Sequence, residues 1–226
     1  MSVHAIYPLV VFDLDGTLVD HPEPIWKTLH ERLGSDLVRR RSTIRAAMSG
    51  EITYAQWFTS DLEMLREAGA NRAAIEAIVD TLRPTPGAVS LVRDLTRAGA
   101  RVALVSGGLD MIRQRVLPSV EFDAIHINRI HFSDEGEITG GTPTAYDRDH
   151  KVSGIRSLTE RFGVTIEQTA FVGDGSNDVY AATEVGYSIA WGSGAHPDLV
   201  QACDHHVVAS DMNALRPLLL RDRDLS

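Results

Sequence analysis

From Gly87 onward, apolar runs alternate with amphipathic segments, and this alternation constrains the fold more than any other feature of the chain. The runs "RVALVSGG", "TAFVGDG" and "YSIAW" are typical of buried strands, whereas "GAVSLVRDLTRAGA" and "KVSGIRSLTERFG" carry apolar residues at helical spacing. The apolar run Leu9–Phe12 adds a buried strand near the N-terminus. Strands that alternate with helices predict an α/β fold, a doubly wound parallel sheet with helices on both faces.

Further segments complete the predicted sheet. The run "FDAIHINRI" predicts a strand, and "HFSDEGEITG" alternates around an acidic turn that contains glycine, which is typical of a β-hairpin. "HHVVA" is predicted as a late strand and "MNALRPLLL" as the terminal helix.

Residues 21–82 differ from both of their flanks. "HPEP" opens this segment and "RPTPG" follows it, and such proline-bearing stretches favour breaks in regular structure. Between them, four stretches have apolar residues at three- and four-residue spacing, which predicts helices. We therefore predict a small all-helical insertion at 21–82, placed after the first strand of a core that comprises 1–20 and 83–226.

Composition bears on partners and location. A net charge of −9 argues against general nucleic-acid binding, which needs a basic face, but it allows an anionic substrate if a divalent cation dominates the local field. No apolar run approaches the roughly 18 residues of a membrane span, and no signal peptide is visible. The single cysteine, Cys203, excludes an internal disulfide. We expect a cytoplasmic protein that binds neither nucleic acid nor membranes, with its oligomeric state left open.

Polar residues follow three of the predicted parallel strands, in "FDLDGT", "LVSGG" and "FVGDGSND". Because the carboxyl ends of parallel strands meet at one edge of a sheet, we expect these residues to surround one crevice. They are Asp13, Asp15, Ser106, Asp174 and Asp178. Converging carboxylates repel one another unless a cation joins them, and Mg²⁺ prefers such oxygen ligands.

A site that combines acids with a bound phosphate also needs fixed positive charge. The chain has two lysines, Lys27 and Lys151, and only Lys151 belongs to the predicted sheet domain. Ser106 and the glycines after it offer a hydroxyl and backbone N–H groups to an anionic oxygen. An acceptor carboxylate, a metal, a lysine and such donors are the parts of a phosphoryl-transfer site.

Taken in order, "DLDGT", "SGG", a single lysine and "GDGSND" resemble the four motifs of the haloacid dehalogenase superfamily. The resemblance covers nearly the whole chain, since the insertion at 21–82 is similar to the helical cap of that superfamily. "VALVSGGLD", "INRI" before a hairpin and "VGDGSNDVYAATEVGYSIA" are similar to its phosphoserine-phosphatase subgroup. The resemblance implies a Rossmann-like core and Mg²⁺-dependent hydrolysis of a small phosphomonoester through an aspartyl-phosphate.

The resemblance also implies a role for each matched residue. Asp13 would be the nucleophile, and Asp15 would be the general acid for the leaving alcohol and then the base for water. Asp13, the backbone carbonyl of Asp15, and Asp174 would hold Mg²⁺. The residues implied in substrate binding are Thr17, Ser106, Gly107, Lys151 and Asn177. Asp178 would support the phosphate and the metal ligands.

The insertion departs from the phosphoserine pattern. That group has a glutamate shortly after the first motif, and the matching position here is Pro22, next to Glu23. It also has an arginine in the cap that binds the substrate carboxylate, and the matching position here is Asp61. An aspartate repels a carboxylate, which argues against phosphoserine as the substrate unless a different helix register brings Arg41, Arg45 or Arg66 to that position. For Tyr54, Trp57 and Phe58, helical spacing favours packing inside the cap over substrate contact.

Two other functions use similar residues. A phosphotransferase or mutase would pass the phosphoryl group from Asp13 to an alcohol other than water. A non-catalytic phospho-acceptor module, as in receiver domains, also combines acids, a hydroxyl and a lysine. Receivers place the acceptor aspartate on a middle strand and have no inserted cap, so the position of Asp13 after the first strand counts against that alternative.

Overall fold

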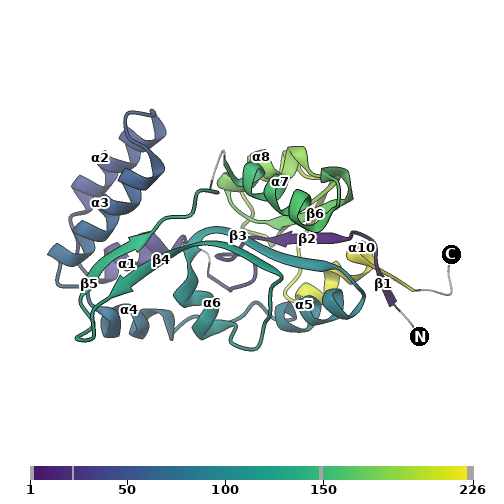
Figure 1. Cartoon of the computed structure of the whole chain (residues 1–226), viewed down its shortest axis with the longest axis horizontal. Coiled ribbons are helices and arrows are strands. Elements are labelled where there is room, and N and C mark those ends of the chain that lie inside the picture. The colour runs from purple at the N-terminus through teal and green to yellow at the C-terminus, as the bar shows by residue number, and fades with distance from the viewer. Residues whose placement is uncertain (1–2, 22, 148–149, 223–226) are drawn as a thin grey trace.

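Seven strands form the main sheet of the computed structural model, which describes residues 3–21, 23–147 and 150–222 (Figure 1). They are β2 (Leu9–Phe12), β3 (Arg101–Leu109), β4 (Ala124–Phe132), β5 (Ile138–Thr142), β6 (Thr169–Gly173), β7 (Tyr187–Trp191) and β8 (His205–Val207). Their order across the sheet is β5-β4-β3-β2-β6-β7-β8, and of these described strands only β5 runs antiparallel to its neighbour. The predicted parallel sheet and β-hairpin are confirmed.

Strand β2 lies in the middle of the sheet and is buried along its whole length. Successive side chains of a strand point to opposite faces, so Phe12 packs in the hydrophobic cluster that includes helix α5 (Ala88–Arg97). Val11 packs in the cluster on the other face, which includes α7 (Lys151–Phe162). The continuous apolar sequence of β2 therefore reflects helices on both sides of the sheet, as in other doubly wound folds.

Shorter helices and turns connect the remaining strands. They are α6 (Asp110–Val116), α8 (Val179–Glu184) and α9 (Pro197–Ala202), together with the 3-10 turns Ile166–Gln168 and Ser176–Asp178. In Figure 1, α5 and α6 lie on one side of the sheet and α7 and α8 on the other.

The four helices predicted between the first strand and the rest of the sheet are present. They are α1 (Ile25–Arg32), α2 (Leu37–Met48), α3 (Tyr54–Glu67) and α4 (Arg72–Val79). Their starts have local causes: at α3, Thr53 and Gln56 form a reciprocal capping box, which satisfies two backbone donors. The division of the chain into a core and a cap remains a prediction, with 21–82 as the predicted cap.

Helix α2 stands away from the sheet, α3 contacts strand β5, and α4 lies against α6 (Figure 1). Phe58 links α3 to the core, because it is buried and belongs to the same hydrophobic cluster as Phe12. Its ring meets that of Trp26 edge-on with centroids 5.5 Å apart. On the hairpin side it packs against Gly141, where a Cβ atom would overlap the Phe58 ring.

The C-terminal segment differs from its prediction as a single helix over 212–220. It forms a 3-10 turn (Met212–Leu215), the short helix α10 (Arg216–Leu219) and strand β9 (Leu220–Asp222). Pro217 lies in the first turn of α10, where its missing N–H costs no helical hydrogen bond. Strand β9 pairs antiparallel with β1 (Val3–Ala5), which was not predicted.

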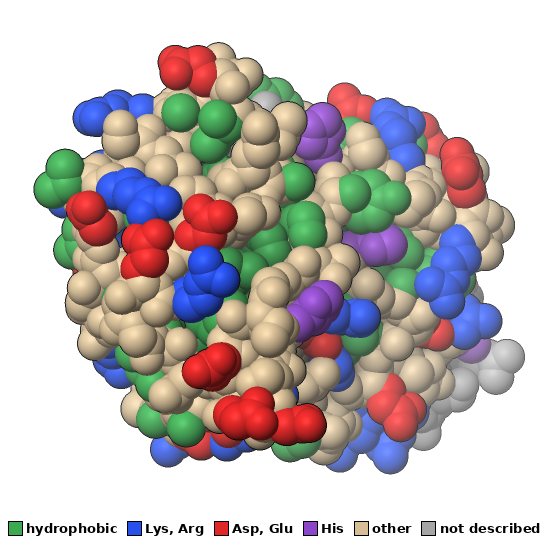
Figure 2. Space-filling model, turned by 60° about the vertical axis from the view of Figure 1, so that its left-hand side comes forward, with side chains coloured by type: hydrophobic (Ala, Val, Ile, Leu, Met, Phe, Trp, Pro, Cys, Tyr) green, Lys and Arg blue, Asp and Glu red, His purple; other side chains and the backbone are tan. Residues whose placement is uncertain are grey.

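The surface has mixed charge. Figure 2 shows acidic and basic side chains interspersed over one face of the molecule. Within the described ranges, no helix is long and apolar enough to cross a membrane.

The Phe58 contact leads to a stability prediction. Replacing the buried Phe58 by Ala leaves a cavity between α3 and the hairpin, so we expect the free energy of unfolding to fall by about 3–5 kcal/mol. Denaturant unfolding followed by circular dichroism measures the change. The matched control is Val38→Ala on α2, where 70% of the side chain is exposed and the expected change is within about 0.5 kcal/mol. A loss below 1 kcal/mol for Phe58→Ala would contradict this packing role.

Candidate active site

The carboxyl ends of β2, β3 and β6 bring the predicted site residues together. Asp13 follows β2, and its N–H donates to the carbonyl of Val172 on the neighbouring strand β6 over 3.0 Å. Ser106 lies near the end of β3, which pairs with β2 on the side opposite to β6. Asp174 directly follows β6. The three motifs therefore meet because β2 is flanked by β3 and β6.

Lys151, the first residue of α7, ties these strand ends together. Its Nζ lies 2.7 Å from Asp13 Oδ1 and 2.5 Å from Asp178 Oδ1, and its side chain is fully buried. Burial opposes a charge on this amine, but the carboxylates of Asp13 and Asp178 outweigh it and raise the pKa of Lys151. The site thus holds a permanent buried ammonium.

Asp178 orders the loop after β6. Its Oδ2 accepts hydrogen bonds of 3.0 Å from the backbone N–H groups of Asp174 and Gly175, while its Oδ1 receives Lys151. The carboxylates of Asp13, Asp174 and Asp178 lie within 4.8 Å of one another. Because both oxygens of Asp178 already have partners, Asp13 and Asp174 are the better placed of the three to contact a cation.

Asp174 is held against the first motif. Thr17 Oγ1 donates to Asp174 Oδ1 over 2.9 Å. Gly16 has a φ of 77°, and a Cβ atom at this position would overlap the Asp174 carboxylate, so only glycine permits this approach. Burial, together with the neighbouring carboxylates, raises the pKa of Asp174 to about 8. Burial likewise raises the pKa of Asp13 to about 7, although Lys151 opposes the shift. For both groups, the positive charge nearby is too small to offset the effect of burial and of the neighbouring carboxylates.

Asp15, the second acid of the first motif, contacts the start of α1. Its Oδ2 accepts a hydrogen bond from the N–H of Ile25 over 3.2 Å. Among the residues that the structure describes, none donates to its buried Oδ1. Burial raises the pKa of Asp15 to about 6. One oxygen of Asp15 is thus fixed and the other is left for a ligand.

The second motif, residues 106–108, lies in β3 where the pairing with β4 shifts register, and this bulged segment is the second-motif loop. Ser106 is buried, and its Oγ accepts a hydrogen bond from the N–H of Gly108 over 3.1 Å. The carbonyl of Gly107 accepts two hydrogen bonds, from Trp26 Nε1 over 2.9 Å and from Asn128 Nδ2 over 2.7 Å. These contacts fix the peptide between Gly107 and Gly108.

Asn177 reaches the same loop through a residue that sequence reasoning missed. Its Nδ2 donates to Asp147 Oδ1 over 3.2 Å. The Asp147 carboxylate lies so close to Gly107 that a Cβ atom there would overlap it. Trp26 and Asn128 were also missed as site residues. Asn128 stands in the "INRI" segment that resembles the family, but neither Trp26 nor Asp147 belongs to a motif that would have indicated it.

The predicted specificity positions of the insertion have other partners. Asp61 is 3% exposed, and its Oδ1 lies 3.3 Å from His30 Nε2 and 3.4 Å from Arg40 Nε. Glu23 forms a surface ion pair with Lys27 over 2.6 Å, and Pro22 lies outside the described residues. Asp61 therefore belongs to an internal ion pair of the helices.

The aromatic residues of α3 occupy two environments. Phe58 is buried in the hydrophobic cluster, in agreement with the packing role expected for it. Tyr54 instead reaches the second-motif loop, because its hydroxyl accepts a hydrogen bond from Asn128 Nδ2 over 2.7 Å.

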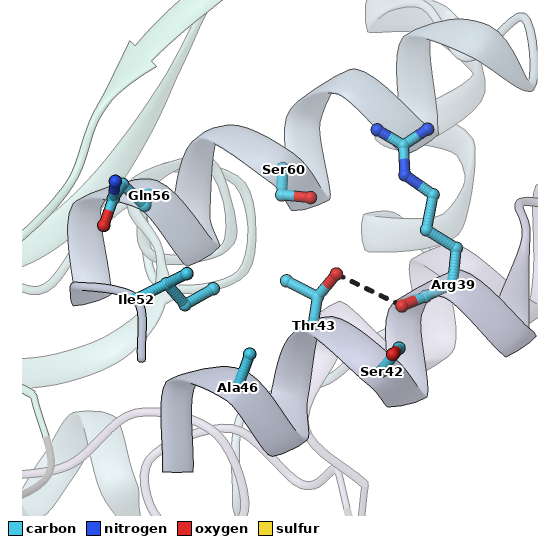
Figure 3. A pocket seen from close by; sticks show the side chains of 7 residues that line it. All are labelled: Arg39, Ser42, Thr43, Ala46, Ile52, Gln56 and Ser60. Atoms are coloured by element: carbon cyan, nitrogen blue, oxygen red, sulfur yellow. Dashed lines mark hydrogen bonds between the residues drawn. The ribbon is translucent and has the colours of Figure 1, made fainter. Parts of the chain in front are cut away.

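A separate pocket of about 380 Å³ lies between α2 and α3 (Figure 3). It is lined by Arg39, Ser42, Thr43, Ala46, Ile52, Gln56 and Ser60. None of these is a predicted site residue, and Arg39 is already paired with Glu67 over 2.7 Å. The convergence of buried acids with Lys151 places the candidate active site at the sheet edge instead.

Comparisons with known proteins agree with this geometry. The chain matches the haloacid dehalogenase-like hydrolase family model over residues 7–186. It is 32% identical over 197 residues to phosphoserine phosphatase SerB2 of Mycobacterium tuberculosis, a match that covers 87% of this chain but 46% of that longer protein. It is 30% identical over 205 residues to the phosphoserine phosphatase of Idiomarina loihiensis, covering 90% of each chain.

Solved structures show the same fold. A phospho-aspartyl intermediate analogue of phosphoserine phosphatase superposes with a TM-score of 0.74 at 23% identity, covering 94% of this chain and 98% of that one. Because the family match extends over most of the sequence and its motifs converge at one sheet edge, the chain belongs to the haloacid dehalogenase-like hydrolases, as its motifs predict.

Proposed function

We propose that this hydrolase is an Mg²⁺-dependent phosphatase that cleaves a small phosphomonoester through an aspartyl-phosphate on Asp13. The observation that carries the proposal is the buried Lys151, whose Nζ lies 2.7 Å from Asp13 beside further acids. Such a lysine orients the attacking carboxylate and offsets the charge that gathers when an anionic phosphoryl group approaches. The relatives named above are phosphoserine phosphatases, which supports the same class of reaction.

The reaction has two balanced steps. A carboxylate oxygen of Asp13 attacks phosphorus while the ester P–O bond breaks, and the leaving alkoxide takes a proton from Asp15. Water then attacks the phosphorus of the acyl phosphate, giving its proton to Asp15, and inorganic phosphate leaves as the Asp13 carboxylate is restored. A raised pKa of about 6 and an unpartnered oxygen suit Asp15 to this exchange of protons.

The donor set fits a hard divalent cation. Asp13 and Asp174 offer carboxylate oxygens, and the backbone carbonyl of Asp15 lies in the same motif. Asp178 is saturated by Lys151 and two backbone N–H groups, so we assign it the positioning of the loop. When bound, Mg²⁺ supplies positive charge that offsets the carboxylates and the phosphoryl oxygens.

Donors around this cluster would bind the phosphoryl oxygens. We assign this role to the Ser106 hydroxyl, the Gly107 N–H, Lys151 and Asn177. Thr17 contributes through Asp174, because its hydroxyl donates to that carboxylate.

For the substrate, we propose a small phosphomonoester other than phosphoserine. The internal ion pair of Asp61 with Arg40 offers no free cation to a substrate carboxylate. Tyr54, next to the second-motif loop, presents an aromatic ring at this end of the site. We also propose a cytoplasmic location, since Cys203 as the single cysteine suits a reducing compartment.

The nucleophile can be tested by substitution. Asp13→Asn removes the attacking carboxylate, so we expect turnover of para-nitrophenyl phosphate with Mg²⁺ to fall by at least about 10³-fold. The control is Asp20→Asn, which alters an exposed acid of the same segment and should leave the rate within about twofold. Full activity of Asp13→Asn would refute its role. If the wild type releases no more than one para-nitrophenol per chain and retains the phosphoryl group on Asp13, the result would favour a phospho-acceptor module.

Metal binding can be tested through stability. Burial raises the pKa of Asp13 to about 7 and of Asp174 to about 8, above the roughly 4 of an unfolded chain. The metal-free fold thus retains protons that the unfolded chain releases, so its stability is greatest below pH 4 as far as these groups are concerned and falls as pH rises through 7 and 8. Mg²⁺ stabilises the ionised carboxylates.

We therefore expect millimolar Mg²⁺ to raise the melting temperature by about 4 °C or more at pH 8, and by less at pH 6. Differential scanning calorimetry with and without chelator measures both effects. The variant Asp174→Asn should lose most of the Mg²⁺ effect. Equal melting temperatures with and without Mg²⁺ at pH 8 would refute the metal site.

Substrate choice can be tested with a panel of phosphorylated metabolites. With Asp61 at the position matched to the substrate carboxylate, phosphoserine loses there a charge-assisted contact worth about 1.5–3 kcal/mol. We expect its kcat/KM to be at least about tenfold below that of the best neutral-alcohol phosphomonoester in the panel. Phosphoserine as the fastest substrate would show that another basic residue binds its carboxylate.

A further inference from the structure

We propose that Trp26 and Asn128 are positioning residues, which hold the Gly107 carbonyl so that the Ser106 hydroxyl is aimed at the phosphoryl group. The inference rests on the proposed function, because it concerns how the second-motif loop, which is the phosphate loop of that reaction, is kept in place. It adds a residue of helix α1, within the predicted cap, to the machinery of the core.

The carbonyl of Gly107 has both of its acceptor positions filled. Trp26 Nε1 donates from α1 over 2.9 Å, and Asn128 Nδ2 donates from β4 over 2.7 Å. A carbonyl oxygen has two lone pairs, so two donors from different elements define its direction. This loop is thus oriented from the cap side and from the sheet side together.

The direction of this carbonyl decides what Ser106 can do. The C=O of Gly107 and the N–H of Gly108 belong to one planar peptide, so fixing the first fixes the second. That N–H donates to Ser106 Oγ over 3.1 Å. The serine oxygen therefore acts as an acceptor toward the loop, and its own proton is directed elsewhere, where it can serve a phosphoryl oxygen. Two donors on the carbonyl also polarise the peptide and strengthen its N–H as a donor.

Asn128 is itself fixed in one orientation. It is fully buried, and its Oδ1 accepts from the backbone N–H of Thr144 over 2.7 Å, which only the oxygen end of the amide can do. Its Nδ2 is thereby turned toward Gly107, and also donates to the hydroxyl of Tyr54 over 2.7 Å. Such a fully satisfied buried amide defines a single geometry.

The indole of Trp26 is fixed by packing. Its ring meets Phe58 edge-on with centroids 5.5 Å apart, and Phe58 is buried between α3 and the hairpin. The indole N–H therefore reaches Gly107 only when α1 and α3 are seated on the core. In this way the position of the cap helices is coupled to the phosphate loop.

A double-mutant cycle tests the proposal. Trp26→Phe keeps the aromatic ring and removes the indole N–H, and Ser106→Ala removes the hydroxyl that it is inferred to position. The rate measured is kcat/KM for para-nitrophenyl phosphate with Mg²⁺, and calorimetry gives the affinity for inorganic phosphate with Mg²⁺. We expect Trp26→Phe to lower both about tenfold with Ser106 present and less than about twofold with Ser106→Ala, because the two changes act through one contact. Ile78→Ala is the packing control: it removes a buried side chain of α4 and should lower the melting temperature with little change in either quantity.

Each outcome bears on a separate claim. Equal losses from Trp26→Phe in both serine backgrounds, no loss in either, or an equal loss from Ile78→Ala would overturn the positioning role while leaving the proposed phosphatase intact. Full activity and phosphate affinity of Ser106→Ala would overturn the role of Ser106 and this inference together. If the wild-type chain hydrolyses no phosphomonoester, the proposed function fails, and the phosphate affinities of the four proteins in the cycle still decide whether Trp26 acts through Ser106.

Discussion

The buried ammonium of Lys151, held between Asp13 and Asp178, is the contact on which the rest of the site depends. Removing a charge from water costs several kcal/mol, and a fully buried lysine is tolerated only when acids meet it at hydrogen-bond distance. Asp13 follows β2 and Asp178 lies in the turn after β6. The ion pairs therefore also join two neighbouring strand ends to the start of α7. Loss of one partner would leave the others buried without compensation, a change that typically costs about 3–5 kcal/mol.

The same arrangement leaves an excess of negative charge. Among the described residues, Asp13, Asp15 and Asp174 all have pKa values raised by burial, and Lys151 is the single ammonium in contact with the cluster. A chain selected only for stability would not gather acids in this way, because each raised pKa marks a carboxyl group whose ionised form is less stable here than in water. A bound divalent cation would offset this negative charge, which explains why the proposed active site retains the cost.

Much of this could be predicted from the sequence because it depends on local signals. Apolar runs that end in polar residues locate the strand ends, and parallel pairing then places Asp13, Ser106 and Asp174 at one edge. The pairing of β1 with β9 could not be predicted, since strands of three residues carry no clear periodicity. Trp26 and Asp147 were missed for a different reason: each becomes part of the site only through tertiary contacts that no spacing in the sequence encodes.

The helical insertion shows how such tertiary contacts separate reaction from specificity. Asp61, to which the family resemblance assigns a substrate-binding position, is turned inward to Arg40 and His30 and therefore belongs to the internal packing of the helices. The contact of Trp26 with Gly107, in contrast, is proposed to position a residue that binds the phosphoryl group, which every phosphomonoester shares. Under the proposed function, a cap that contacts the second-motif loop through α1 can change its substrate without altering the chemistry at Asp13. For that reason the core motifs predict the reaction, whereas we expect the substrate to depend on how the helices of the predicted cap pack.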